Sequence, residues 1–381
     1  MNHYIYLDNN ATSRPSAECI EAVYASMHGG YGNPSSKHLF GDNARQLVND
    51  ARKQVAALVN AAPAEIVFTS GATESNYMAV MAARELNPGR NHVVLSAIEH
   101  PSVLALVRTL EQQGMRVSLA PADAQGRVDL AALSALLTDD TALLSLMWAN
   151  NETGVLQPLE QALGMAHARG ILVHSDAVQA VGKVPVDITA VPIDLMSFTA
   201  HKMHGPMGIG ALYVRKGIKL PALFDGHQER RRRGGTENVP GIVGFGVACE
   251  LAGEQLAEEA LVIARLRDRL EQGVVRDVPF ATINGAKSPR IPNTTSITFG
   301  TLPAEALLSR MEKAGIYASQ GAACAAGQVE PSHVLLAMGL SEAKALATVR
   351  FSLSHETTEE KIDQVLRILP ELIGAMAGMA A

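Results

Sequence analysis

The sequence predicts an α/β fold in which helices cover both faces of a largely parallel sheet. From about residue 35, short apolar runs of strand length alternate with amphipathic runs of helical periodicity. The strand runs are apolar on both faces, as in "TALLSLMWA" (141–149), which is typical of strands buried on both sides. Because strands and helices follow one another in turn, helical crossovers between parallel strands are expected.

The elements follow in a regular order along the first part of the chain. In "LVNDARKQVAALVN" (47–60) apolar residues recur at helical spacing, and "NPG" (87–89) is a typical helix stop. In order, we expect a helix at 47–60, a strand at 65–70, a helix at 73–86, a strand at 92–97, a helix that ends at Gly114, a strand at 115–120, a short helix at 129–137, strands at 141–149 and 171–176 on either side of a helix that ends at Gly170, and strands at 193–198 and 209–214.

A long amphipathic helix at 247–275, after the glycine-rich stretch "GGTENVPGIVGFG", predicts a connection to a second, smaller domain. That domain carries the strand-like "TTSITFG", a helix near "AEALLSRMEKAG" and the strand-like "TVRFSLS", which together are an α+β pattern. We expect a large domain of residues 16–255. Residues 1–15 and 256–381 would form the small domain, which carries Cys324 and Arg350.

Composition and charge favour a cytoplasmic globular protein. The 381 residues carry a net charge of −6, with 47% hydrophobic and 18% charged residues, so neither nucleic acid nor a membrane is an expected partner. The N-terminal "MNHYIYLDNN" has no signal-peptide pattern, and no apolar stretch reaches spanning length. Three cysteines (Cys19, Cys249, Cys324) without a CxxC pair argue against a disulfide framework or a cysteine-based structural zinc site.

Polar residues follow four of the predicted strands, at the sheet edge where ligands bind in such folds. In "FTSGATES" a strand leads into a helix that begins near Ala72 and Thr73. Its free N–H groups and dipole suit a phosphate, and an ordinary threonine N-cap is an equal alternative. His100 follows "HVVLSA", a position that a purely structural histidine also fits.

The other two strand ends carry amides and a carboxylate. Asn150 and Asn151 in "MWANNETG" offer donors and acceptors, although the same residues favour a simple turn. Asp176 ends the strand "ILVHSD", and Gln179 lies one turn further on. A carboxylate there needs a cationic partner or a tuned protonation state to offset its desolvation, whereas helix N-capping would explain it alone.

Lys202, in "SFTAHKMHGPMGIG", lies between two apolar strands. Burial there would lower its pKa and leave a nucleophilic amine, while a turn lysine in water is the alternative. A phosphate site, a buried carboxylate, an imidazole and a strand-end lysine are together what pyridoxal 5'-phosphate (PLP) requires. The lysine would form the Schiff base, the aspartate would keep the pyridinium nitrogen protonated, and the helix N-terminus would hold the phosphate.

The motifs resemble those of cysteine desulfurases of the NifS/IscS group, most closely the NifS type. Over residues 4–366 they occur in the family's order: "YLDNNAT", "GNPSSKH", "FTSGATES", "EHPSV", "NNETG", "DAVQ", "AHKMHGP", "GHQERRRRGGTEN", "EPSHV" and "VRFSLS". The resemblance implies the PLP-dependent transferase fold (fold type I) of class V aminotransferases, with a mainly parallel seven-stranded sheet. It also implies a homodimer that takes sulfur from L-cysteine and leaves L-alanine.

The resemblance also assigns roles to residues at matching positions. It implies that Lys202 forms the Schiff base, Asp176 binds the pyridinium nitrogen, Gln179 bonds the ring oxygen, His100 stacks on the ring, Ala72, Thr73, Thr199 and His201 bind the phosphate, Thr236 binds the phosphate of the other subunit, Asn151 lies near cofactor and substrate, and Asn33 and Arg350 hold the substrate carboxylate. An arginine suits that last task because it can donate two parallel hydrogen bonds to a carboxylate, although a plain surface arginine is the alternative.

Cys324 matches the family's persulfide-forming cysteine. Its surroundings, "YASQGAACAAGQVEPSH", are small residues with little to bury, which suits a thiolate that must reach a substrate and then a partner. Cys19 and Cys249 lie in helical, apolar surroundings typical of inert core thiols. Gln320 and Ala322 stand where the family leads us to expect serines, and Asp225 stands where it has glycine.

The expected reaction uses three side chains. Lys202 removes the Cα proton of L-cysteine, the Cys324 thiolate attacks the substrate sulfur, and His100 carries a proton. The persulfide then passes to a sulfur-acceptor protein such as an iron–sulfur scaffold. No intrinsic metal site is expected, because His201 and His204 lack the HExxH spacing, although the Cys324 persulfide could transiently ligate a cluster together with a scaffold.

Several alternatives stay open on the sequence. Another class V PLP aminotransferase would need no thiol and would give a keto acid instead of alanine and sulfide, and a selenocysteine lyase would act on the selenium analogue. A catalytically silent sulfur-scaffold subunit is expected to have lost Lys202 or Asp176, and both are present. The basic run Arg230–Arg233 fits a solvated face, although the resemblance puts it near the subunit interface. The sequence does not name the sulfur acceptor.

Overall fold

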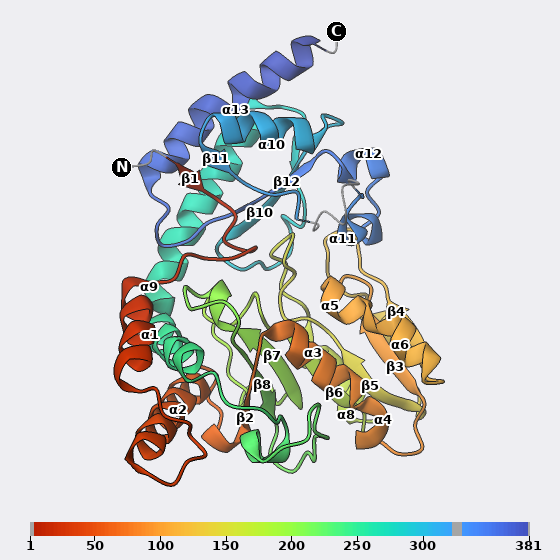
Figure 1. Ribbon diagram of the computed structural model, residues 1–381. Coiled ribbons are helices and arrows are strands. Elements are labelled where there is room, and N and C mark those ends of the chain that lie inside the picture. Colours follow the sequence, from red (N-terminus) through yellow and green to blue (C-terminus); the bar gives the residue numbers. More distant parts are fainter. Residues whose placement is uncertain (1–3, 322–329, 380–381) are drawn as a thin grey trace.

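A seven-stranded sheet forms the centre of the molecule in the computed structural model, which describes residues 4–321 and 330–379 (Figure 1). Within the described residues its strand order is β2-β8-β7-β6-β5-β3-β4, and β8 alone runs antiparallel to its neighbours. The strands are β2 (Ile66–Thr69), β3 (His92–Ser96), β4 (Arg116–Ala120), β5 (Thr141–Ser145), β6 (Leu172–Asp176), β7 (Leu195–Thr199) and β8 (Gly210–Val214). The predicted α/β fold with a mainly parallel seven-stranded sheet is confirmed.

Helices cover both faces of this sheet because alternate strand residues face opposite sides. Phe68 and Val94 belong to one core cluster, whereas their chain neighbours Val67 and Val93 belong to another. The first cluster includes residues of α2 (Leu39–Leu58), α7 (Leu130–Leu136), α8 (Leu159–His167) and α9 (Val239–Asp277), and the second includes residues of α3 (Ala72–Met81), α4 (Ala83–Leu86), α5 (Pro101–Leu104) and α6 (Leu106–Gln112). Six of the seven strands are therefore mostly buried from two sides, whereas the edge strand β4 is largely exposed.

A separate hydrophobic cluster lies around two smaller sheets. In the described residues, β9 (Ala281–Ile283), β10 (Thr294–Phe299) and β12 (Thr348–Ser352) are antiparallel, and β1 (Ile5–Tyr6) pairs in parallel with β11 (Ile316–Tyr317). The remaining helices are α1 (Ala17–Gly29), α10 (Ala304–Lys313), α11 (His333–Ala337), α12 (Glu342–Ala345) and α13 (Glu359–Met379). The division into residues 16–255 and the rest stays a prediction.

Helix α9 contributes to both cores. Ile242 and Phe245 pack in the cluster beside the large sheet, whereas Leu266 and Leu270 pack with the smaller sheets. Figure 1 shows α9 extending from the sheet toward α10 and α13. Among the described residues, none of the helices combines the length and apolar character needed to cross a membrane.

The glycine-rich stretch before the predicted long helix is partly helical, because α9 begins at Val239 and not at residue 247. Asn238 caps this start by accepting a hydrogen bond from the Gly241 N–H at 3.2 Å. Gly244 lets the helix approach its neighbours, since a Cβ there would lie 2.7 Å from Val23 Cγ2 and 2.9 Å from Pro206 Cγ. Close packing, and not a loop, explains the glycines. The predicted helix at 73–86 also divides, at Ala82, into α3 and α4.

This packing gives a prediction with a matched control in the same helix. Gly244→Ala should lower the free energy of unfolding by about 1–3 kcal/mol, because the new methyl group overlaps Val23 and Pro206. Gly253→Ala should raise it by up to about 1 kcal/mol, because its Cβ meets Leu58 Cδ1 at an ordinary 3.6 Å and alanine favours helix. Urea unfolding measures both. Equal effects of the two substitutions would contradict the close approach at Gly244.

Candidate functional site

A cavity of about 570 Å³ lies at the carboxyl ends of the central strands. Ten of the predicted site residues line it: Ala72, Thr73, His100, Asn151, Asp176, Gln179, Thr199, His201, Lys202 and Arg350. Asn33 and Thr236 do not line it and are exposed on the chain. Cys324 lies outside the described residues, although Ser319 and Gly321 before it line the cavity.

Lys202 enters the cavity from the short turn that follows β7. Its Nζ donates hydrogen bonds to the backbone oxygens of Asn10 at 2.7 Å and Ala11 at 2.5 Å. Burial, together with the positive charge of Arg350, lowers the pKa of Lys202 to about 8, and nearby Asp176 acts in the opposite direction. The lysine is therefore partly desolvated, as its position between two apolar strands predicts.

Asp176 lies at the end of β6 and is buried. Its Oδ1 accepts a hydrogen bond from the Val178 N–H at 3.0 Å, and its Oδ2 accepts one from Asn76 Nδ2 at 2.8 Å. The first contact closes a local turn, and because the described segment between β6 and β7 contains no helix, the alternative of helix N-capping by Asp176 is wrong. Since the carboxylate also lines the cavity, it can hold a positively charged ring nitrogen as well.

Asn76 and Ser102 connect Asp176 to His100, and sequence reasoning missed both. Asn76 Nδ2 donates to Ser102 Oγ at 2.9 Å, and the Ser102 N–H donates to His100 Nδ1 at 3.1 Å. Because Nδ1 accepts this bond, the neutral ring carries its proton on Nε2. Although part of the ring is exposed, the surrounding protein lowers the pKa of His100 by desolvation, against the effect of Asp176. A neutral imidazole is therefore favoured.

Arg350, on β12, already has an anionic partner. Its Nη2 donates to Asp8 Oδ1 at 2.6 Å and its Nη1 donates to the Asn151 backbone oxygen at 3.1 Å. Among the described residues, Arg350 Nε and Asn151 Oδ1 are buried without a hydrogen-bond partner. Because both atoms are covered by protein, they are unsatisfied groups of the packed interior and do not themselves face the cavity.

The first turn of α3 forms the opposite end of the cavity. Gly71 precedes the helix and provides no side-chain cap, so the N–H groups of the first turn are available to an anion. Glu74 in that turn would oppose an anion, but Arg233 Nε donates to its Oε1 at 2.8 Å. The Thr199 hydroxyl donates to the Ile209 backbone oxygen at 2.8 Å, so its hydrogen is already used.

The loop before Thr236 contains a turn that is held in place by a buried ion pair, and it is not simply a solvated basic face. Glu229, Arg230 and Arg231 have positive φ values of 45°, 56° and 63°, a left-handed conformation that residues other than glycine seldom adopt. Arg52 holds this turn with a buried bidentate ion pair to Glu229, at 2.6 and 2.7 Å. The prediction of a solvated face is therefore wrong for part of the run, since Arg233 also pairs with Glu74.

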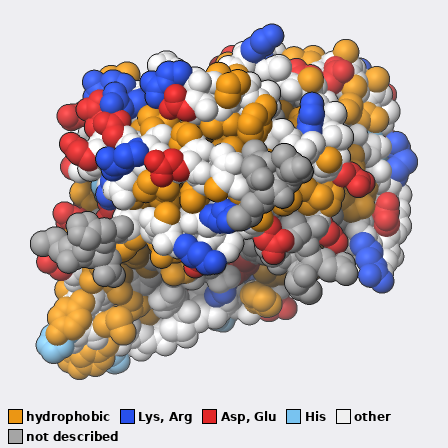
Figure 2. Space-filling model, turned by 90° about the horizontal axis from the view of Figure 1, so that it is seen from above, with side chains coloured by type: hydrophobic (Ala, Val, Ile, Leu, Met, Phe, Trp, Pro, Cys, Tyr) orange, Lys and Arg blue, Asp and Glu red, His pale blue; other side chains and the backbone are white. Residues whose placement is uncertain are grey.

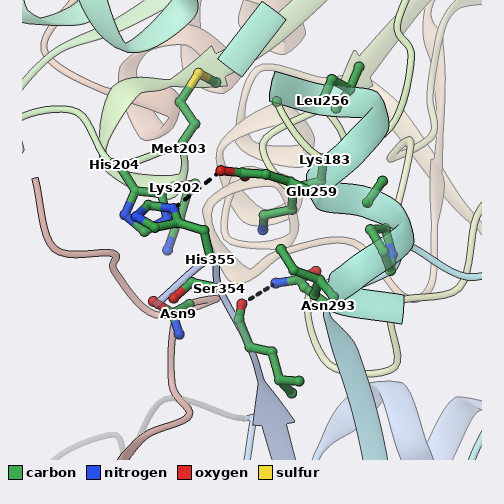
Figure 3. A pocket seen from close by; sticks show the side chains of 15 residues that line it. Asn9, Lys183, Lys202, Met203, His204, Leu256, Glu259, Asn293, Ser354 and His355 are labelled. Atoms are coloured by element: carbon green, nitrogen blue, oxygen red, sulfur yellow. Dashed lines mark hydrogen bonds and ion pairs between the residues drawn. The ribbon is translucent and has the colours of Figure 1, made fainter. Parts of the chain in front are cut away.

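A second, small cavity of about 40 Å³ lies behind Lys202 (Figure 3). Lys183, His204, His355 and Glu259 also line it. The rings of His204 and His355 lie 4.1 Å apart, and His355 Nδ1 lies 3.7 Å from Glu259 Oε1. No group of three or more metal-ligating side chains exists in the part of the chain that the structure describes.

Charges of both signs are mixed on the face shown in Figure 2. Lys and Arg side chains lie between Asp and Glu side chains and hydrophobic ones, without a broad surface of a single sign. Inside the cavity, the positive side chains of Lys202 and Arg350 share the lining with the carboxylate of Asp176.

Comparisons with known proteins agree on one family. The model of the aminotransferase class-V family matches residues 5–365. A cysteine desulfurase of Gluconacetobacter diazotrophicus is 47% identical over 99% of this chain and 95% of its own length, and the cysteine desulfurase NifS of Azotobacter vinelandii is 45% identical over 99% and 94%. A solved NifS-like protein has a TM-score of 0.91 at 37% identity, over 98% of this chain and all of that one. These matches confirm the resemblance to cysteine desulfurases of the NifS type.

The electrostatics of the cavity predict how Lys202 titrates in the cofactor-free protein. Labelling of Lys202 by an amine reagent, followed by mass spectrometry, should be half-maximal near pH 8 instead of 10.5. Asp176→Asn should move this midpoint downward, because the carboxylate favours the charged ammonium. Asp187→Asn on the surface is the control and should leave it unchanged. A midpoint that rises in the Asp176 variant would contradict the assignment.

Proposed function

Because the chain belongs to the class-V aminotransferase family, we propose that it acts as a cysteine desulfurase that converts L-cysteine to L-alanine. The observation that carries this proposal is the desolvated amine of Lys202 in the same cavity as the buried carboxylate of Asp176. A lysine that is partly neutral near pH 8 can attack an aldehyde and can accept a proton from carbon.

The residues that line the cavity fit PLP. The uncapped N-terminus of α3 suits the phosphate, Asp176 suits a protonated ring nitrogen, and Lys202 suits the Schiff base. When bound, PLP supplies an electron sink for the electron pair left on the substrate Cα.

The other residues of the predicted site complete this arrangement. Ala72, Thr73 and His201 would hold the phosphate, joined by Thr199 once its hydroxyl releases the Ile209 backbone oxygen. Gln179 would bind the ring oxygen and His100 the ring face. His100, with its proton on Nε2, can also deliver that proton to a leaving or attacking sulfur. Lys202 would take the Cα proton of the substrate and return a proton to the product.

Arg350 would bind the substrate carboxylate, with Asn33 as a second contact. Asp8 accepts a single hydrogen bond from Arg350 Nη2, so it competes with a substrate carboxylate for this guanidinium. The position of Arg350 in the lining of the cavity supports this role.

Cys324 would receive the sulfur. Its thiolate attacks the substrate sulfur, the carbon–sulfur bond breaks, and the products are alanine and a cysteine persulfide, without an external oxidant or reductant. The other cysteines are poor candidates because burial raises the pKa of Cys249 well above its usual value and also raises that of Cys19. Ser319 and Gly321, which precede Cys324 in the sequence, line the cavity.

A homodimer and a sulfur-acceptor protein complete the proposal. Six large apolar side chains between residues 20 and 40 are 47–69% exposed on the single chain, more than a soluble surface usually gathers: Ile20, Tyr24, Met27, Tyr31, Leu39 and Phe40. We propose that a second copy covers them and that Thr236, exposed on the single chain, binds the phosphate of that copy's cofactor, as the resemblance implies. We propose cytoplasmic action and an acceptor such as an iron–sulfur scaffold, which could share a cluster with Cys324.

The cysteine assignment predicts a separation of binding from turnover. Cys324→Ala should bind PLP with its visible absorption intact, while release of sulfide from L-cysteine falls by at least about a hundredfold. Cys249→Ala is the matched control and should keep activity within about twofold. Mass spectrometry of the wild type should map the persulfide to Cys324. A persulfide on Cys19 or Cys249 would overturn the assignment.

The shared site predicts complementation between inactive chains. Lys202→Ala and Thr236→Asp should each be inactive, the second because the new carboxylate repels phosphate. In a mixed dimer, one site collects both defects and the other has an intact lysine and an intact threonine. Equal mixing makes about half of the dimers mixed, so about a quarter of the wild-type activity should return. If Thr236 acts within its own chain, mixing restores nothing even though subunit exchange is verified.

A further inference from the structure

Lys183 is a second lysine beside the cavity, and the reaction described above does not use it. It follows Gln179 by one turn, and Gly182 between them has φ +77° and closes the turn. A Cβ at Gly182 would lie 3.0 Å from Met203 Cβ, so the turn fits closely against the segment that carries Lys202. Lys183 does not line the large cavity, but shares the small one behind it with Lys202 (Figure 3).

The contacts of Lys183 decide how the Gln179 amide is oriented. Lys183 Nζ donates to Gln179 Oε1 at 2.5 Å, and a lysine can only donate hydrogen bonds. The other end of the amide, Nε2, donates to the Asn10 backbone oxygen at 3.1 Å. Since Nε2 carries two hydrogens and Asn10 takes one, the amide has a second hydrogen to offer to a ligand in the cavity that Gln179 lines.

The same ammonium also fixes Asn10. Lys183 Nζ donates to Asn10 Oδ1 at 3.2 Å, and Asn293 Nδ2 donates to the same oxygen at 3.0 Å. Asn10 Nδ2 is thereby directed to Thr294 Oγ1 at 2.8 Å. One lysine therefore orients two buried amides, and a reversed Gln179 amide would place its NH₂ group against an amine that has no acceptor to offer when protonated.

The charges near Lys183 favour an anion at this place. Burial, followed by the positive charges of Lys202 and Arg350, lowers the pKa of Lys183 well below its usual value. A negatively charged ligand oxygen beside Gln179 would favour the protonated form of Lys183 by offsetting the positive charges of Lys202 and Arg350. The donor that Gln179 offers and the surplus of positive charge thus fit the same kind of ligand atom.

We propose that Lys183 is a positioning residue that turns the Gln179 amide so that its nitrogen donates to the anionic ring oxygen of the bound cofactor. The proposal rests on the PLP-dependent function given above. Lys183 touches neither the substrate nor the reacting atoms in this account. It acts through Gln179, and its removal should therefore alter the properties of the bound cofactor more than the stability of the chain.

The test compares cofactor binding and the pH titration of the cofactor's visible band in Lys183→Met, Lys183→Arg and the surface control Lys53→Met. In Lys183→Met, PLP should bind the cofactor-free protein about tenfold more weakly, because a hydrogen bond to an anionic oxygen is lost. The midpoint of the visible titration should rise by about one pH unit, because loss of a donor and of nearby positive charge favours protonation of the cofactor. Lys183→Arg keeps donors and should restore most of both effects.

Two results would overturn the proposal. In the first, Lys183→Met has the same PLP affinity and the same midpoint of the visible titration as Lys53→Met. In the second, Lys183→Arg is as defective in both properties as Lys183→Met. If Lys183→Met does not fold, Gln179→Glu gives the same test, since it keeps an acceptor for Lys183 but presents oxygen to the cofactor. Its midpoint should rise as well, and an unchanged midpoint would refute the role. A wild-type protein without PLP binding would instead refute the proposed function itself, and this inference with it.

Discussion

Asn10 is the residue on which the arrangement of the site depends. It is 2% exposed, and its backbone oxygen accepts hydrogen bonds from Lys202 Nζ and Gln179 Nε2. Its side-chain oxygen accepts one from Lys183 Nζ, and its amide nitrogen donates to the Asn151 backbone oxygen. One buried residue near the N-terminus therefore positions two lysines differently, one toward the cavity and one behind it. Burial makes each of these bonds costly to leave unmade.

The segment around Asn10 also joins the two hydrophobic cores. Leu7 packs with the core of the smaller sheets, and the Asn10 N–H donates to Ser352 Oγ on β12 at 2.9 Å. Arg350 on the same strand pairs with Asp8, two residues before Asn10. The arginine proposed to hold the substrate and the lysine proposed to hold the cofactor are thus spaced by one short stretch of chain. A shift of that stretch would change both contacts together.

Much of this site could be predicted from sequence because strand ends in a parallel sheet converge. Asp176, His100 and Lys202 each follow a buried strand, and all three line the cavity. Asn76 and Lys183 could not be predicted that way, since their contacts join residues distant along the chain, such as Asn76 with Asp176 and Lys183 with Asn10. The early start of α9 could not be predicted either, because glycines are typical of loops. Only the structure shows that Val23 and Pro206 pack closely against Gly244. Thr236 and Asn33 do not line the cavity of the single chain, and Cys324 lies outside the described residues.

The central claim is that the hydrogen bonds of Asn10 direct Lys202 into the large cavity and hold Lys183 behind it, so that Lys202 is the amine that binds the cofactor. Borohydride reduction of the PLP-loaded protein fixes the cofactor to the amine that holds it, and peptide mass spectrometry then identifies the lysine. The account predicts the added mass on the peptide of Lys202, with Lys183 unmodified, because Lys202 alone of the two lines the large cavity. Attachment to Lys183, or division of the cofactor between the two lysines, would contradict it.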